Sequence, residues 1–343
     1  MKLAIHQEDG SFSDRWISYC QENNILFKVV NCYDSNIIDQ LRDCTALMWH
    51  WNQNEYRAML FAKQLTISLQ NTNIRVFPDV NTSWHFDDKL GQKYLFESIK
   101  ATAVKSYAFY NERDAIKWIE TCSFPKVFKL RGGAGSVNVK LINNRLEAKK
   151  IINKAFSNGF NPFDKYTRLK DRIFDFKRDR NLKSLKKVFG GFLRLLIKNE
   201  IEKFSSKEIG YVYFQDFIKD NSFDTRVIVI GERCFAVRRY VRNNDFRASG
   251  SGLIEYRKEF FDERILKMAF EISNKLNSQC AAFDFVLDNN QPKIIEVSYC
   301  FLMGKFYDNC NGYWDRDLVW HNKQVNPQYF IIEDFIKTIN TPF

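Results

Sequence analysis

The sequence predicts a mixed α/β (α+β) fold with two or three packed units, and three observations support this class. The chain has 343 residues, of which 45% are hydrophobic, so it can bury a substantial core. Short apolar strands alternate with helical periodicities over the first 87 residues, a pattern typical of a mainly parallel sheet. Later in the chain, two strands that each carry one carboxylate are joined by a turn and predict an antiparallel hairpin.

The first region, residues 1–87, is expected to form an α/β domain. Short apolar runs predict strands at 2–6, 26–31, 46–51 and 75–78. Apolar residues at helical spacing predict helices at 13–24, 36–43 and 55–69. No Gly-x-Gly-x-x-Gly motif opens a helix here, so a dinucleotide-binding domain of the Rossmann type is not favoured.

The second region, residues 88–212, has a different texture. An acidic pair, Asp87 and Asp88, precedes a predicted helix at 90–101 and is typical of a helix N-cap. Strands are then expected at 108–110 and 125–130, and helices at 115–121 and 147–155. A basic helical insertion is expected near 161–205.

A glycine-rich segment, 131–139, follows the strand that ends in Lys129 and Leu130. Glycines allow backbone N–H groups to close on phosphate oxygens, and Lys129 adds a positive charge beside them. The same segment also fits an ordinary hairpin loop. Lys129 on the preceding strand and Ser136 inside the loop favour a phosphate site.

The third region, residues 213–343, contains the carboxylate hairpin. An amphipathic helix is expected at 263–276, followed by strands carrying Asp284 and Glu296, and a last helix at 332–339. If the strands pair antiparallel, both carboxylates can lie side by side on one face, where they repel each other unless a cation such as Mg²⁺ lies between them. Either acid alone would more commonly be a solvated residue of the outer face.

Cysteine and histidine patterns exclude several function classes. The eight cysteines contain no Cys-x-x-Cys pair, and the four histidines have no metal-ligand spacing. We interpret the cysteines as reduced core residues of a cytoplasmic protein, without a disulfide framework or a zinc site. Acidic residues follow the start too early for a signal peptide, and we expect no transmembrane segment.

The net charge of +11 is concentrated in one block. Residues 165–200 contain 12 Lys or Arg against 4 acids. Such a block could serve a nucleic acid, an anionic membrane surface or a large anionic substrate, or could be the solvated face of a helical insertion. No nucleic-acid-binding motif accompanies it, so no nucleic-acid partner is expected.

From Asp88 to Ser298, the order of motifs resembles the ATP-grasp superfamily. The resemblance is to the branch that includes glutathione synthetase and the ligases that add glutamate to a ribosomal protein or to a lysine-pathway carrier. The matching segments are Asp88-Lys89, Phe124 to Lys129 ahead of the glycine loop, Gln215-Asp216-Phe217-Ile218, Asp224-Thr225-Arg226-Val227, Arg239 with Asp245-Phe246-Arg247, and the acids Asp284 and Glu296. It implies an ATP-grasp fold with a variable N-terminal domain at 1–87 and two ATP-clasping subdomains at 88–212 and 213–343.

The resemblance also implies roles for individual residues. Lys89 and Lys129 would contact ATP phosphates, with the loop Gly132, Gly133, Ala134, Gly135 and Ser136 closing over them. The segment Gln215, Asp216, Phe217 and Ile218 would hold adenine, and Asp224 the ribose. The arginines Arg226, Arg239 and Arg247 would bind phosphate or a substrate carboxylate. Asp284, Glu296 and Ser298 would hold Mg²⁺, or Mn²⁺ in its place.

Two departures from the family pattern bear on the metal. Ser298 and Ser249 stand where the family usually has Asn, and a serine hydroxyl reaches less far than an amide, so the number of metal ions is left open. Arg247 has an alternative role as the ion-pair partner of a buried acid such as Asp284 or Glu296.

The implied activity is an ATP-dependent carboxylate–amine ligase that forms an amide or peptide bond through an acyl phosphate. The expected partners are a small carboxylate and an amine, with an anionic glycan or peptide as a larger acceptor, and a homodimer is left open. Two other functions are retained: a kinase or phosphotransferase on the same fold, and a nucleotide-binding module without turnover.

Overall fold

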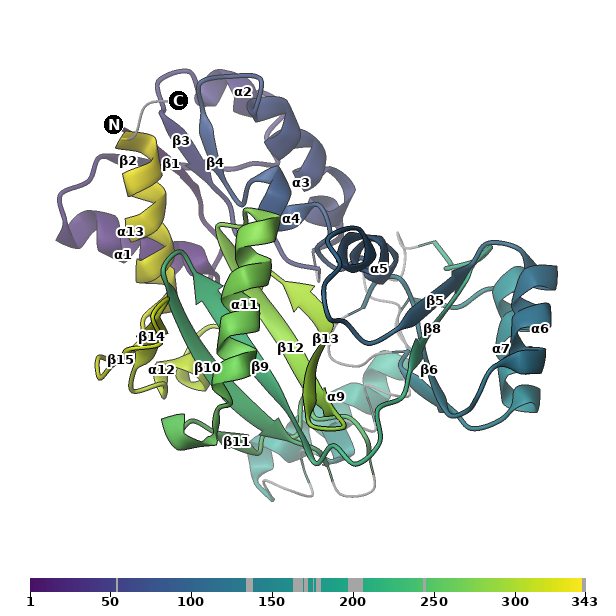
Figure 1. Ribbon diagram of the computed structural model, residues 1–343. Helices are drawn as coiled ribbons and strands as arrows, with labels where there is room; N and C mark the ends of the chain where they lie inside the picture. The colour runs from purple at the N-terminus through teal and green to yellow at the C-terminus, as the bar shows by residue number, and fades with distance from the viewer. Residues whose placement is uncertain are drawn as a thin grey trace. The chain divides into compact units, whose positions relative to one another are not determined.

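The computed structural model describes residues 1–53, 55–133, 138–162, 169, 172–174, 176, 180–196, 206–242 and 245–340. Over these residues the chain divides into two compact units (Figure 1). Unit 1 contains 1–86, 95–103 and 220–343, and unit 2 contains 87–94 and 104–219. The mixed α/β class predicted from the sequence is confirmed.

The N-terminal part of unit 1 is built on a parallel sheet with the strand order β2-β1-β3-β4. Every residue of the central strand β1 is buried, because helices cover both faces of such a sheet. The strands are β1 (Leu3–His6), β2 (Phe27–Val30), β3 (Ala46–Met48) and β4 (Arg75–Phe77), and the helices are α1 (Phe12–Glu22), α2 (Ile37–Gln40), α3 (Tyr56–Leu69) and α4 (Val80–Ser83).

The C-terminal part of unit 1 is built on an antiparallel sheet with the order β13-β12-β9-β10-β14-β15, and β11 pairs with β10. Helix α11 (Glu263–Leu276) lies along one face, across β9 and β12 (Figure 1). The strands are β9 (Phe223–Ile230), β10 (Arg233–Tyr240), β11 (Ile254–Glu255), β12 (Cys280–Asp288), β13 (Gln291–Ser298), β14 (Tyr313–Asp315) and β15 (Trp320–His321). Around them are the short helices η1 (Lys258–Phe260) and α12 (Lys305–Asp308) and the last helix α13 (Pro327–Asn340).

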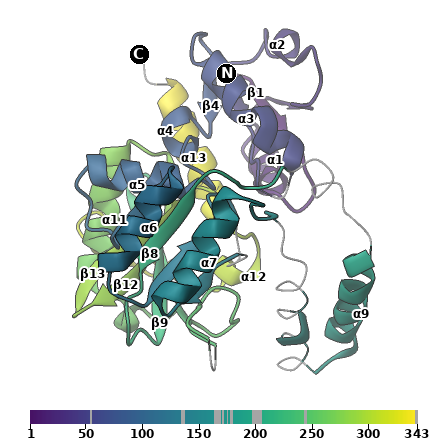
Figure 2. The same ribbon diagram turned by 90° about the vertical axis from the view of Figure 1, so that its right-hand side faces the viewer.

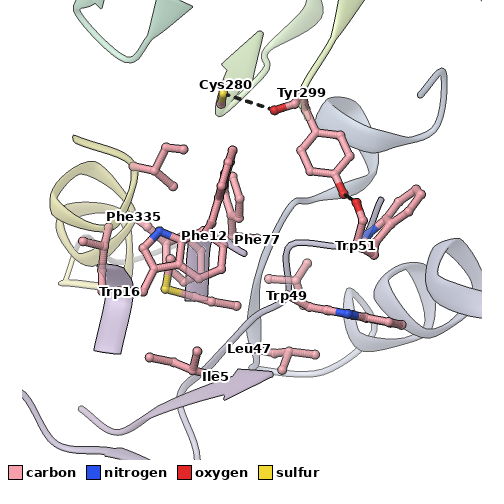
Figure 3. Packing of buried hydrophobic residues seen from close by; sticks show 14 of the residues in the cluster. Ile5, Phe12, Trp16, Leu47, Trp49, Trp51, Phe77, Cys280, Tyr299 and Phe335 are labelled. Carbon is pink, nitrogen blue, oxygen red and sulfur yellow. Dashed lines mark hydrogen bonds between the residues drawn. The ribbon is translucent and has the colours of Figure 1, made fainter. Parts of the chain in front are cut away.

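A continuous aromatic core joins the two sheets of unit 1 (Figure 3). Tyr299, directly after β13, is fully buried and donates its hydroxyl to the backbone oxygen of Trp51, which follows β3. The rings of Trp51 and Phe86 pack on Tyr299 with centroid distances of 5.4 and 4.8 Å. This packing attaches the end of β13, the strand that carries the predicted metal ligands Glu296 and Ser298, to the N-terminal sheet.

Unit 2 is built on an antiparallel sheet with the order β5-β8-β6-β7. Helices α6 (Glu112–Thr121) and α7 (Arg145–Phe156) lie side by side and contribute to one core with the sheet (Figures 1 and 2). The strands are β5 (Ser106–Phe109), β6 (Lys126–Lys129), β7 (Lys140–Ile142) and β8 (Val212–Asp216). Helix α9 (Leu182–Leu196) also belongs to this unit, and α5 (Lys89–Ser98) begins in unit 2 and ends in unit 1.

Local capping explains where the helices differ from the sequence prediction. Helix α6 begins at Glu112, three residues earlier than expected, because the Asn111 side chain accepts the backbone N–H groups of Arg113 and Asp114. Residues 213–216, placed at the start of the third region, lie in β8, which pairs with β5 and β6 and so belongs to unit 2. The elements not predicted from the sequence are α4, β9, β10, β11, η1, α12, β14 and β15.

Candidate functional site

Two buried lysines lie at the base of the glycine loop in unit 2. Lys129, the last residue of β6, is 8% exposed, and its Nζ donates to Gln215 Oε1 at 2.6 Å. Lys89, the first residue of α5, is 6% exposed, and its Nζ donates to the backbone oxygen of Gly133 at 3.0 Å. Strand register explains the first contact. Phe128 and Phe214 face the helical core, so Lys129 and Gln215, each one residue further along its strand, share the opposite face of the sheet.

The start of the loop is fixed to the segment that precedes α5. The Gly133 N–H donates to Asp87 Oδ1 at 2.8 Å, and the Lys89 N–H donates to the Arg131 oxygen at 2.9 Å. Gly133 has a φ of 117°, a conformation that favours glycine. A β-carbon at Gly132 would lie 3.1 Å from Asp87 Oδ2, so the close approach also favours glycine there. Ala134, Gly135 and Ser136, predicted to close over phosphate, lie outside the described residues.

The predicted adenine segment follows the end of β8. Asp216 Oδ1 accepts from Lys126 Nζ at 2.6 Å, on the sheet face that packs against α6. Lys126 lies over the rings of Tyr107 and Trp118 at 5.2 and 5.9 Å from their centroids. The Asp216 side chain is therefore used within the fold, which leaves the backbone around Phe217 and Ile218 as the adenine candidate.

A buried charge network occupies one face of the antiparallel sheet in unit 1. Arg226 donates Nε and Nη2 to the two oxygens of Asp284, at 2.6 and 2.8 Å. Arg239 donates in the same way to Asp224, at 2.6 and 2.7 Å, and its Nη2 lies 3.0 Å from Asp284 Oδ2. The register pairs Arg226 with Asp284 across β9 and β12, and Asp224 with Arg239 across β9 and β10. Opposite residues share a face, so all four side chains meet.

The network fixes the charge of Asp284. Burial by itself raises the pKa of this carboxyl, but the guanidinium groups of Arg226 and Arg239 outweigh it and hold the pKa well below its usual range. Burial raises the pKa of Asp224, which faces one guanidinium through both oxygens. Tyr307 of α12 is buried near Arg226, and burial raises its pKa as well. The two guanidinium groups therefore favour the ionised form of Asp284.

The three predicted metal ligands share that face. Glu296 of β13 lies directly opposite Asp284 of β12, and a bulge at Ile295 follows this pair. Ser298 lies two residues further along the same face, and its Oγ donates to the Cys300 oxygen at 2.8 Å. Among the described residues, no group of three or more His, Cys, Asp or Glu side chains is arranged to hold a metal.

All three side chains offer oxygen, the donor that Mg²⁺ prefers. The arginines favour the ionised form of Asp284. An ionised carboxylate has roughly four acceptor positions. Three are used by the N–H groups of Arg226 and Arg239, so a cation would share Asp284 with them.

Arg247 is held by a neighbour in sequence. Its Nη2 lies 2.6 Å from Asp245 Oδ2, and its Nε lies 3.0 and 2.9 Å from the two Asp245 oxygens. Both side chains are about one-fifth exposed, at 18% and 19%. Of the two alternative partners considered for Arg247, Asp284 and Glu296, the first contacts Arg226 and Arg239.

Sequence reasoning missed several residues that shape these clusters. Asp87 was identified only as part of a helix cap, yet it contacts the glycine loop. Tyr211 accepts the Arg131 N–H at 2.7 Å through its hydroxyl, which donates to Glu208 at 2.9 Å. Tyr307 follows a segment without strand or helix periodicity. Of these residues, only Asp87 carried a local signal that could have identified it, because it directly precedes the motif pair Asp88-Lys89.

Comparison with known proteins gives structural relatives only. No protein-family model and no curated protein sequence matches the chain. An ATP-grasp RimK-domain protein from Sphaerobacter thermophilus matches with a TM-score of 0.57 and 13% identity, over 98% of this chain and 100% of that one. A D-alanine–D-alanine ligase from Bacillus anthracis, in complex with ATP, matches with 0.57 and 12% identity, over 99% and 98%. The ATP-grasp ligase PsnB, in complex with a precursor peptide, matches with 0.54 and 9% identity, over 99% and 98%.

Proposed function

Because this chain has the ATP-grasp fold, we propose that it is an ATP-dependent ligase that joins a carboxylate to an amine through an acyl phosphate. The main support is the pair of buried ammonium groups, Lys89 and Lys129, that contact the loop start and the adjacent strand of unit 2. A buried cation stabilises a nearby anion more than an exposed one does, because water screens it less. Polyphosphate is the anion that such a site suits best.

In this proposal the residues of unit 2 bind the nucleotide. Lys89 and Lys129 contact the phosphates, and the loop from Gly132 to Ser136 supplies backbone N–H groups. The backbone of Phe217 and Ile218 contacts adenine. In unit 1, both oxygens of Asp224 are engaged by Arg239, so we assign Asp224 to orienting that arginine instead of to the ribose.

The metal ligands come from the face of the antiparallel sheet in unit 1 that carries the charge network. Asp284, Glu296 and Ser298 would hold Mg²⁺, which neutralises phosphate charge when it is bound. Arg226 and Arg239 keep Asp284 ionised and fix its orientation through three N–H···O contacts. The two arginines would therefore orient the metal ligand Asp284 and add positive charge for the reacting phosphate.

The chemistry follows from the need to activate a carboxylate. A substrate carboxylate oxygen attacks the γ-phosphorus of ATP, the bond from phosphorus to the ADP oxygen breaks, and an acyl phosphate forms. The amine then attacks the acyl carbon, phosphate leaves and the nitrogen loses a proton. We assign Arg247 to the substrate carboxylate, which would take the place of Asp245 at its planar fork through the same two contacts. Holding the reactants in line can supply roughly 7–11 kcal/mol of the barrier.

A nucleotide-binding module without turnover is the second candidate. The observation that favours it is the engagement of Asp284 by two arginines together with Ser298, a weak metal ligand whose hydroxyl contacts Cys300. A kinase on the same fold is the third. Product analysis with ATP, Mg²⁺ and a panel of carboxylates and amines separates them. The ligase yields an amide with ADP and phosphate, the kinase a phosphorylated product, and the module bound but unconsumed ATP.

A further inference from the structure

Helix α9, at the lower right of Figure 2, carries three large apolar side chains that are exposed. Leu182, Phe189 and Phe192 are 78%, 64% and 52% exposed. They stand at positions i, i+7 and i+10, which lie on one stripe of a helix that turns about 100° per residue. Two exposed phenylalanines beside a leucine form an apolar surface of the kind that usually marks an interaction site.

The opposite side of α9 packs through small residues. Ser184 is 4% exposed, and Gly191 is buried. A β-carbon added at Gly191 would lie 2.9 Å from Leu169 Cδ1 and 3.1 Å from Arg172 Cδ, so that face is closely covered. Arg172 also donates Nη1 to the Lys187 oxygen at 2.9 Å. The helix is therefore closely covered at Ser184 and Gly191, whereas Leu182, Phe189 and Phe192 remain exposed.

Positive charge flanks the apolar stripe. The helix sequence contains Lys183, Lys186, Lys187 and Arg194 and no acidic residue. At about 100° per residue, these four positions form one arc between the apolar stripe and the small face. Lys186 and Lys187 are exposed. An apolar stripe beside a cationic arc is the pattern of helices that lie in the interface of an anionic membrane.

We propose that α9 docks this protein on the surface of an anionic lipid membrane. Phe189, Phe192 and Leu182 enter the boundary between headgroups and acyl chains, and Lys186 and Lys187 contact lipid phosphate. Nucleic acid is disfavoured as the occupant because its phosphate backbone offers nothing to a stripe of leucine and phenylalanine.

Docking in the plane of the membrane also suits the length of the helix. The 15 residues of α9 span about 22 Å, less than the roughly 30 Å of a bilayer core. Among the described residues, no helix is both long and apolar enough to cross a membrane. The proposal is independent of the ligase reaction.

Flotation of the full-length protein with vesicles tests the proposal. We expect binding to phosphatidylcholine vesicles that contain about one third phosphatidylserine, and at least about tenfold less to phosphatidylcholine alone. The double variant Phe189→Ser/Phe192→Ser should lose binding, and Lys186→Glu/Lys187→Glu should reduce it strongly. Leu146→Ser, on α7 of the same unit and 74% exposed in the native chain, is the matched control and should bind normally.

Thermal unfolding curves keep the result interpretable. Phe189 and Phe192 are exposed, so their replacement by serine should leave the unfolding temperature unchanged. Failure to bind the phosphatidylserine vesicles would overturn the proposal, as would full binding by a folded Phe189→Ser/Phe192→Ser variant. Retention on a mixed-sequence RNA oligomer without vesicle binding would instead assign the helix to a nucleic acid.

Discussion

Arg226 and Asp284 face each other across strands β9 and β12, and the guanidinium of the first holds both oxygens of the second at 2.6 and 2.8 Å. Arg239 adds a contact of 3.0 Å to the same carboxylate. The proposed metal ligand is therefore an anion whose rotation is fixed before any cation binds. Glu296 lies opposite it, and the alternative in which this acid pair is merely solvated does not describe Asp284, which is 7% exposed.

Removal of Arg226 should destabilise unit 1. Arg226→Met leaves the Asp284 carboxylate buried with less compensation, a change that typically costs about 3–5 kcal/mol. Because the Arg226 side chain is 20% exposed, we expect about 3 kcal/mol, the low end of that range. Urea unfolding measures it. Arg264→Met breaks an ion pair to Asp262 whose arginine is 46% exposed and should leave the midpoint nearly unchanged. Equal effects of the two variants would contradict the structural role of the network.

Loss of Lys129 should weaken ATP binding. Lys129→Met removes a buried positive charge from the base of the glycine loop, and we expect the dissociation constant for ATP to rise by at least about tenfold. Titration calorimetry measures the affinity. The control is Lys126→Met on the same strand, whose ammonium pairs with Asp216 on the helix-covered face. That variant should lose stability and keep its ATP affinity, and the reverse pattern would exclude the phosphate assignment.

Glu296→Gln should stop ATP turnover without unfolding the protein. The change removes one charged metal ligand while keeping the shape of the side chain. We expect the rate of ADP release at saturating Mg²⁺ to fall by more than the roughly 10–100-fold typical of residues outside the ligand shell. Glu271→Gln, an exposed change on α11, is the control. A folded Glu296→Gln protein that releases ADP at the native rate would remove Glu296 from the metal site.

Acid should destabilise the protein through His50. This imidazole stacks on Phe12 with a centroid distance of 3.6 Å, and burial lowers its pKa to about 3. The unfolded value is about 6.5, so the folded state binds fewer protons between these values. The free energy of unfolding should fall as the pH is lowered through this window, by up to about 1.4 kcal/mol per pH unit.

A variant isolates the contribution of His50. The free energy of unfolding of His50→Gln, measured with urea, should depend less on pH between about 4 and 6.5 than that of the native chain. The variant no longer takes up a proton at this position when it unfolds. If the slope is unchanged in His50→Gln, other groups account for the acid sensitivity.

Local signals in the sequence predicted most elements but not how these elements contact one another. The helix at 263–276 was predicted with its observed ends, because its apolar positions repeat at helical spacing and Asp262 caps it. The pairing of Asp284 with Glu296 followed from strand alternation and the turn between them. The contacts of Arg226 and Arg239 with Asp284 could not be predicted, because they depend on the order β12-β9-β10, which no local pattern encodes. Asp87 was seen only as a cap, because its contact with Gly133 joins residues 46 positions apart in the chain.

Trapping of the acyl intermediate tests the ligase proposal most directly. The native protein is incubated with ATP and Mg²⁺, each carboxylate that stimulates ADP release is added without an amine acceptor, and hydroxylamine is supplied as the nucleophile. An acyl phosphate reacts with hydroxylamine, so a ligase should give a hydroxamate in amounts matching the ADP released, and none with Glu296→Gln. ADP release without hydroxamate for every stimulating carboxylate would contradict the ligase mechanism and would favour phosphate transfer to another group.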